Sequence, residues 1–180
     1  MDIFMNILKE YEGLIGALSG VIVTLILTHV LKNVGGLKIY AVNNDIEFIK
    51  NGKTNEGFHT KEIADKMSVN FLSVEFHLEI YNNSETARIF REIELCFYKG
   101  SEKVFSTRPE DKETEKRYQS GQSLRSEILN INVMPKQITS RELVRYLRKD
   151  DVDIIRECNK LLIELKDYKG RTNKILLKEF

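Results

Sequence analysis

The sequence has few cysteines and almost no excess charge of either sign, and each shortage excludes a class of protein. Its only two cysteines, Cys96 and Cys158, lie in apolar-patterned segments without a partner at the spacing of a metal or redox site. A secreted disulfide scaffold is denser in cysteine, so we expect reduced, buried thiols, with one disulfide as the alternative. The net charge is +1. A dedicated nucleic-acid binder usually has a clear basic excess, so we expect no nucleic-acid partner.

The sequence also lacks the motifs by which many enzymes and metal sites are recognised. It contains no G-x-x-x-x-G-K-[ST], G-x-G-x-x-G or G-x-S-x-G. His29, His59 and His77 do not have H-x-x-x-H spacing. The acidic residues at 150–153 lack the glycine and the final glutamate of a calcium-binding loop. We therefore expect a protein without catalytic activity, cofactor or metal.

What the sequence does have is one long apolar run, GLIGALSGVIVTLILTHVLKN, from Gly13 to Asn33. No residue between Glu12 and Lys32 carries a formal charge. Nineteen helical residues span about 28 Å, close to the thickness of a bilayer hydrocarbon core. The preceding segment is acidic and no A-x-A-like site follows, unlike a secretion signal. The run predicts an uncleaved transmembrane helix, with a buried helix and a signal peptide as alternatives.

Lysines on the two sides of this run predict its orientation. The N-terminal side offers only Lys9, whereas the C-terminal side offers Lys32, Lys38, Lys50 and Lys53. Because basic residues are enriched on the cytoplasmic side, we expect the C-terminal domain in the cytoplasm of a single-pass plasma-membrane protein. Apolar residues also recur at helical spacing before the run, which predicts an early helix start or a short interfacial helix: Ile3, Phe4, Ile7, Leu8 and Tyr11.

Small residues follow one another along one side of the predicted membrane helix. Gly16 and Gly20 form a G-x-x-x-G pattern, which lets two helix backbones approach closely in lipid. Because glycine is frequent in membrane helices, we expect a plain anchor, with a homo-oligomer through this surface as the alternative. The residues predicted to make the helix–helix contact are Gly13, Gly16, Ala17, Gly20 and Thr24.

After a linker at 35–38, the period changes to two-residue alternation, which is typical of strands. SVEFHLEIYNNS and REIELCFYKG each place apolar residues on one face, and we expect Glu92, Glu94, Cys96 and Tyr98 to face outward. The chain ends in a predicted hairpin around Lys169-Gly170. We predict a turn at 43–45 and loops at 51–66 and 107–123. Domain boundaries at 1–34, 35–38 and 39–180 follow, with a mainly β, antiparallel immunoglobulin-like sandwich in the last.

One segment of the sandwich has a helical pattern instead. Thr139 and Glu142 form a capping box before apolar residues at helical spacing, which predicts a helical insert within 139–158. Basic residues on that helix predict a solvated face, with a patch for the membrane or an acidic partner as the alternative: Arg141, Arg145, Arg148 and Lys149.

The order of these parts resembles a group of uncharacterised bacterial single-pass membrane proteins. The resemblance rests on GLIGALSGVIVTLIL, GGLKIYAV, FHLEIYNNSETARIFREIELCFYKG, Pro135 before KQI, and the closing DYKG hairpin. It implies an N-terminal transmembrane helix followed by an immunoglobulin-like β-sandwich, and it brings no catalytic residues.

Two hypotheses for the function follow. The first is a non-enzymatic module that is held at the membrane and presents a surface for a protein partner. The alternative is a ligand-sensing membrane effector, of the kind found among phage-defence or toxin-like proteins, that oligomerises through its transmembrane helix.

Overall fold

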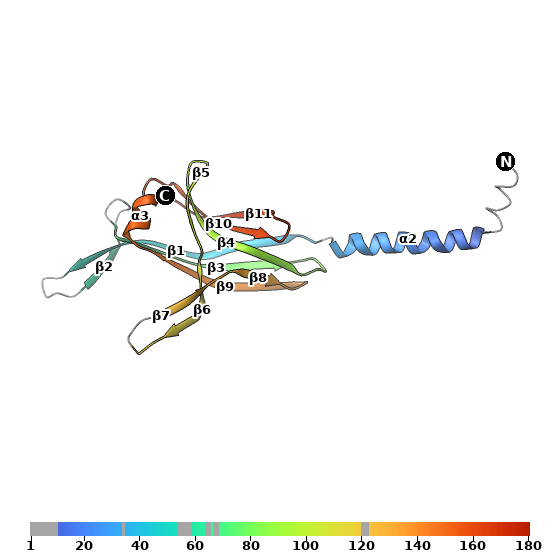
Figure 1. The fold of residues 1–180 in the computed structure, drawn as a ribbon, viewed down its shortest axis with the longest axis horizontal. Helices are drawn as coiled ribbons and strands as arrows, with labels where there is room; N and C mark the ends of the chain where they lie inside the picture. The colour runs from blue at the N-terminus through green and yellow to red at the C-terminus, as the bar shows by residue number, and fades with distance from the viewer. Residues whose placement is uncertain (1–10, 34, 54–58, 64–65, 67–68, 120–122) are drawn as a thin grey trace.

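The computed structural model describes residues 11–33, 35–53, 59–63, 66, 69–119 and 123–180. Its first described element is the helix α2, Glu12–Asn33, which extends from one end of a β-sandwich without packing on it (Figure 1). The predicted helical face formed by residues 3–8 lies outside the described residues. Within the residues that the structure describes, eleven strands and one short helix follow.

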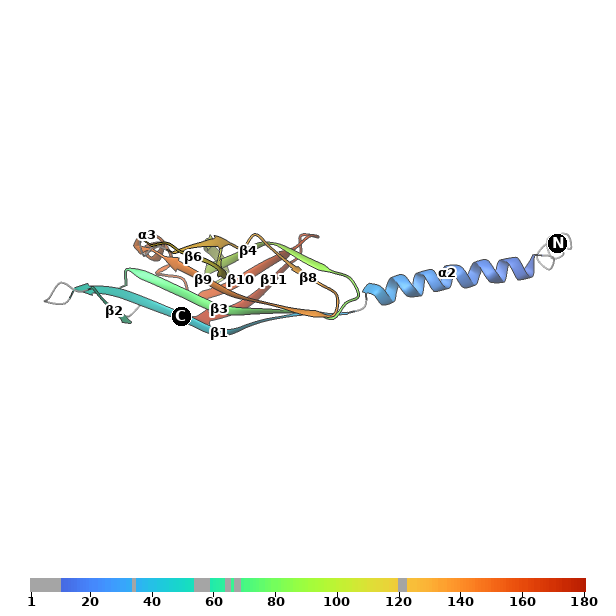
Figure 2. The same cartoon turned by 90° about the horizontal axis from the view of Figure 1, so that it is seen from below.

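The strands form two antiparallel sheets. One sheet has the order β2-β1-β3-β9-β6-β7 and the other β11-β10-β4-β5, with β8 paired to β4. Figure 2 shows the two layers from the side. The elements are β1 Leu37–Lys53, β2 His59–Ile63, β3 Phe71–Asn82, β4 Arg88–Lys99, β5 Glu102–Thr107, β6 Glu110–Arg117, β7 Ser123–Glu127, β8 Asn130–Val133, β9 Gln137–Leu147, α3 Lys149–Ile155, β10 Lys160–Asp167 and β11 Thr172–Glu179.

The core lies between the sheets and follows from the alternation in the sequence. Every second residue of β3, from Leu72 to Ile80, is buried, because the side chains of a strand point to opposite faces. Phe90 and Phe97 of β4 meet them from the other sheet. Helix α3 closes the end of the sandwich far from α2 by burying Val152 and Ile155. The mainly β class is therefore confirmed.

The helical insert is shorter than predicted. The segment from Gln137 to Leu147 is strand β9, and the capping-box prediction at Thr139 is wrong. β9 pairs with β3 along its length, from Asn82–Gln137 to Leu72–Leu147. The sequence of β9 has a helix-like spacing of apolar residues because two neighbours, Leu143 and Val144, are both apolar. Both are buried, although they point to opposite faces of the sheet. Within 139–158 only α3 is helical, because the pairing of β9 with β3 overrides the local helical propensity.

Three other segments predicted as turns or loops extend the sheets. The predicted loop at 51–66 contains the end of β1 and the strand β2, which pair from Lys53–His59 to Ile49–Ile63. The predicted turn at 43–45 is a bulge within β1, where the register shifts between Val42 and Asp45 and Asn43 has a φ of 53°. The predicted loop at 107–123 contains most of the β6–β7 hairpin. Its strands are charged because this hairpin is an exposed wing of the sheet, as Figure 1 shows.

Candidate functional site

Helix α2 exposes its whole apolar surface. Within the described residues, one helix, Glu12–Leu31, is long enough and apolar enough to cross a membrane. None of it is buried against the sandwich. A secretion signal near an N-terminus has the same character. A Cβ added at Gly13, Gly16 or Gly20 would meet no atom, so the predicted small-residue surface is open in the single chain. Thr24 donates its hydroxyl hydrogen to the Gly20 carbonyl at 2.8 Å, which satisfies it within the helix.

The segment after α2 is fastened to the turn between β3 and β4. The Asn83 N–H donates to the Gly36 carbonyl at 3.1 Å. A Cβ on Gly35 would lie 2.3 Å from the Asn83 oxygen and 2.5 Å from the Ser84 Cα, closer than real contacts allow. The fully buried side chain of Asn82 holds this turn in place through hydrogen bonds. Only glycine at 35 permits this approach.

Asn82 satisfies all its hydrogen-bonding groups inside the domain. Its amide nitrogen donates to the carbonyls of Thr86, Val133 and Met134 at 2.8–3.1 Å. Its oxygen accepts from the backbone N–H and the hydroxyl of Ser84. Asn82 thus ties the β3–β4 turn to the end of β8 where α2 leaves the domain, and the IYNNS motif of the sequence is structural here.

The predicted basic patch does not form one stripe on a helix. Arg141 and Arg145 lie on β9, where acidic side chains of the wing neutralise them. Arg145 is 3.2 Å from Glu110, and Arg141 is 3.6 Å from Asp111. Arg148 and Lys149 are exposed at the start of α3, at the end of the sandwich far from α2. The patch prediction was drawn on a helix that is absent at 139–147.

The outer face of the six-stranded sheet carries an excess of carboxylates. Lys112 contacts Glu75 and lies 3.6 Å from Glu142. Asp45 and Glu47 have no ion pair within the described part of the chain. We name this surface the acidic sheet face, and it consists of Asp45, Glu47, Glu75, Glu79 and Glu142, with His77 3.7 Å from Glu79.

A recess of about 280 Å³ opens on the acidic sheet face. Asp45, Glu47 and Glu75 line it together with apolar side chains. Ile63 is 77% exposed and Tyr146 is 51% exposed at its border. Large apolar side chains next to unpaired carboxylates suit a partner that is both basic and apolar. The alternation of β3 pointed to a polar face, but only the pairing of β1, β3 and β9 brings these acids together.

A second ionic cluster lies on the outer face of the five-stranded sheet. Glu164 is 8% exposed and lies 2.8 Å from both Lys103 and Lys174. Tyr98 also donates to it. Burial alone would raise the pKa of Glu164, but these hydrogen bonds outweigh it and lower the pKa to about 2. The same contacts raise the pKa of Lys103 against the effect of burial. Both groups are held in their charged forms and cannot exchange protons near neutral pH.

Cys96 and Tyr98 next to this cluster correct the sequence prediction. Both were expected to face outward into solvent, yet Cys96 is fully buried and Tyr98 is 8% exposed. Lys103 and Glu164 cover this part of β4. Cys96 and Cys158 are free thiols, as expected. Burial raises the pKa of the Cys96 thiol to about 12, which favours the protonated thiol at neutral pH.

Among the described residues, no group of three or more His, Cys, Asp or Glu side chains is placed to hold a metal ion. His77 contacts the Ser140 hydroxyl on the acidic sheet face. The arrangement offers two kinds of feature: an exposed apolar helix and charged surfaces on a rigid sandwich.

These features define a class, the immunoglobulin-like β-sandwich with an N-terminal apolar helix. The chain belongs to the family described as the YopI Ig-like domain, which matches residues 35–178. It is 38% identical over 176 residues to the SPbeta prophage-derived uncharacterized protein YopI of Bacillus subtilis (strain 168), and 97% of each chain is covered. A solved structure that is similar is an uncharacterized β-sandwich protein from Clostridium difficile 630, with a TM-score of 0.34, 14% identity and coverage of 79% of this chain and 85% of that one. The expected immunoglobulin-like class is confirmed.

Proposed function

We propose that this protein is a non-enzymatic module that α2 anchors in the membrane and whose sandwich presents an interaction surface to a protein partner. The exposure of the apolar side chains of α2 is the observation that supports anchoring in the membrane. Leu14, Leu18, Ile22 and Leu25 are 53–64% exposed, and water would contact this surface if no lipid covered it. At about 25 cal/mol per Å² of apolar surface, transfer of such a helix to lipid is strongly favourable.

Fractionation of cells tests the anchor. The wild-type chain should stay with membranes after an alkaline carbonate wash, with an intact mass that includes α2. Leu18→Lys/Ile22→Lys should leave the membrane fraction, because each lysine costs about 3 kcal/mol at the centre of a membrane helix. The control, Leu124→Lys/Leu176→Lys, adds the same charge to exposed positions of the sandwich. A wild-type chain that has lost α2 by cleavage would contradict the anchor and support a secretion signal.

The acidic sheet face is the surface that best suits a protein partner. It combines Asp45 and Glu47, which lack ion pairs within the described residues, with the exposed ring of Tyr146. Aromatic side chains frequently supply much of an interface's binding energy, and complementary charge adds specificity. We therefore infer a partner segment that carries basic and apolar side chains.

Site-specific photocrosslinking in cells tests this surface. A photoreactive phenylalanine derivative at Tyr146 should capture a defined protein, and Asp45→Lys/Glu47→Lys should abolish that product. The same derivative at Ile154 on α3, also about half exposed, is the control position. A product that appears equally at both positions, or survives the charge reversal, would show that the acidic sheet face is not the interface.

The non-enzymatic part of the proposal is supported by the state of the ionisable groups. The buried cluster around Glu164 is locked into ion pairs, and the Cys96 thiol is protonated at neutral pH. Catalytic acids, bases and nucleophiles instead need pKa values near the working pH. Turnover of any substrate by the intact protein in activity screens would overturn this part.

A further inference from the structure

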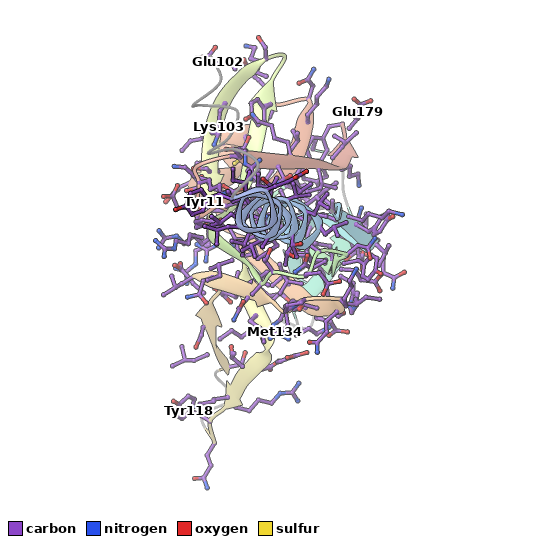
Figure 3. All side chains as sticks on the ribbon, turned by 90° about the vertical axis from the view of Figure 1, so that its right-hand side faces the viewer. Tyr11, Glu102, Lys103, Tyr118, Met134 and Glu179 are labelled. Carbon is purple, nitrogen blue, oxygen red and sulfur yellow. The ribbon has the colours of Figure 1, made fainter. Side chains whose placement is uncertain are left out.

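Four segments meet at the end of the sandwich from which α2 leaves. They are the linker with the start of β1, and the turns β3–β4, β8–β9 and β10–β11 (Figure 1). We name this end the proximal rim, and it consists of residues 35–38, 83–88, 134–138 and 167–172. Figure 3 views the molecule from the helix end and shows Met134 to one side of α2, between it and the outlying Tyr118.

The proximal rim is basic. It contains five basic and only two acidic side chains: Lys38, Arg88, Lys136, Lys169 and Arg171 against Glu85 and Asp167. Both acids are already paired, Glu85 with Lys136 at 3.2 Å and Asp167 with Arg171 at 3.1 Å. Three of the basic side chains therefore have no carboxylate partner within the described chain, namely Lys38, Arg88 and Lys169.

Two loops at the opposite end of the sandwich are less basic than the rim. Residues 99–102 and 148–159 contain five acidic and four basic side chains: Glu102, Asp150, Asp151, Asp153 and Glu157 against Lys99, Arg148, Lys149 and Arg156. The basic balance of the rim is a property of the fold, because the rim residues come from four separate segments.

The rim also has the shape and the side chains of a lipid-facing surface. A recess of about 260 Å³ lies within it, lined by Arg88, Asp167, Tyr168 and Arg171 beside Gly35. Tyr168 is 52% exposed and Met134 is 48% exposed. The Lys169 ammonium lies 5.4 Å from the centre of the Tyr168 ring. Tyrosine and lysine at the boundary of an anchor are typical of headgroup depth.

If α2 spans the bilayer, the short linker keeps the rim at the membrane surface. Asn33 ends α2 and Leu37 begins β1, and four steps along an extended chain reach at most about 14 Å. The bond from Asn83 to Gly36 shortens the free part further. The polar headgroup layer adds several ångströms on each side of the hydrocarbon core, so the rim falls within reach of it.

We propose that the proximal rim binds the anionic headgroups of the leaflet into which α2 is inserted, with a headgroup phosphate in the recess beside Arg88. This contact holds the sandwich in one orientation relative to the membrane. The inference depends on the proposed anchoring, but not on the partner of the acidic sheet face.

A tryptophan reporter tests this contact in the full-length protein. The chain contains no tryptophan, so Tyr168→Trp provides a single reporter on the rim and Ile154→Trp a matched reporter on α3. Each is reconstituted into phosphatidylcholine vesicles with and without phosphatidylglycerol, and quenching by a lipid with a nitroxide on its headgroup is measured. Quenching of the Tyr168→Trp reporter should be strong and should require phosphatidylglycerol. The Ile154→Trp reporter should be quenched weakly in both vesicles.

Charge removal sharpens the test. Arg88→Gln/Lys169→Gln should lower the ratio of quenched to unquenched Tyr168→Trp reporter by about fivefold for each charge, as expected for basic side chains near an anionic leaflet. Arg148→Gln/Lys149→Gln removes the same charge from the other end and should leave the ratio unchanged. Added salt should weaken the quenching of the Tyr168→Trp reporter in the otherwise unchanged chain.

Vesicle flotation separates the two ways in which the idea can fail. If the wild-type protein floats with vesicles but its Tyr168→Trp reporter is quenched equally without phosphatidylglycerol, or equally in both double variants, the rim does not bind anionic headgroups. If the wild-type protein does not float with either vesicle, the proposed anchoring itself is wrong and the rim contact fails with it.

Discussion

Gly35 shows how one residue determines where the anchor joins the domain. Its Cα packs against the Asn83–Ser84 backbone so closely that any side chain would displace the linker. A Cβ added to the neighbouring Gly36 would meet only open space. From the sequence, both glycines look like parts of one flexible hinge.

We expect Gly35→Ala to destabilise the junction by about 1–3 kcal/mol, as overpacking of a tight contact usually does. The change should lower the melting temperature of the detergent-solubilised protein and speed hydrogen exchange at the Asn83 amide, whose bond to Gly36 would lengthen. Gly36→Ala is the matched control and should leave both nearly unchanged. Equal effects from the two alanines would show that Gly35 is not tightly packed.

Glu164 predicts a dependence of stability on pH. Its pKa is about 2 in the folded protein, below the ordinary value of about 4.3 for an unfolded chain. The folded state therefore gains stability from this carboxylate above about pH 4.3 and loses it as the pH falls toward 2, by about 3 kcal/mol in all. Chemical denaturation from pH 7 to pH 2 measures the loss, which Glu164→Gln should reduce. Glu157→Gln, at an exposed ion pair with Lys99, should leave the pH profile as in the wild type.

At the scale of elements, α2 and β9 show opposite relations between pattern and structure. The apolar run of α2 is so long that only a helix is compatible with it, and the helix forms from Glu12 to Asn33. β9 contains a helical pattern and is nevertheless a strand, because β3 offers a complete pairing edge. A local pattern decides the structure only where no long-range partner competes.

Oligomerisation through α2 stays a prediction at this scale. Gly16→Ile/Gly20→Ile should reduce crosslinking between copies of the protein in membranes, because the larger side chains keep helix backbones apart. A double substitution on another part of the helix, Leu18→Ile/Val21→Ile, changes no small residue and should crosslink as the wild type does. Unchanged crosslinking of the glycine variant would leave α2 as a plain anchor.

At the scale of the whole molecule, the lysines after α2 predict that the sandwich lies in the cytoplasm. Protease added to intact spheroplasts should then leave residues 37–180 uncut, and should degrade them only after the membrane is disrupted. Once the protease reaches the sandwich, the exposed β6–β7 wing provides sites that it can cleave. A periplasmic or extracellular domain of known location serves as the control. Cleavage in intact spheroplasts would reverse the topology and would place the proximal rim against the outer leaflet.

The sequence by itself determined the apolar helix, the β class, the alternating core strand β3 and the final hairpin around Gly170, because each depends on neighbours along the chain. It did not show the strand β9, the burial of Cys96 and Tyr98, or the pairing of Glu164 with two lysines. The tertiary structure also decided where charge lies. The acidic sheet face and the basic proximal rim each combine residues from three or four segments far apart in the sequence, and a chain of nearly zero net charge contains no local signal for either.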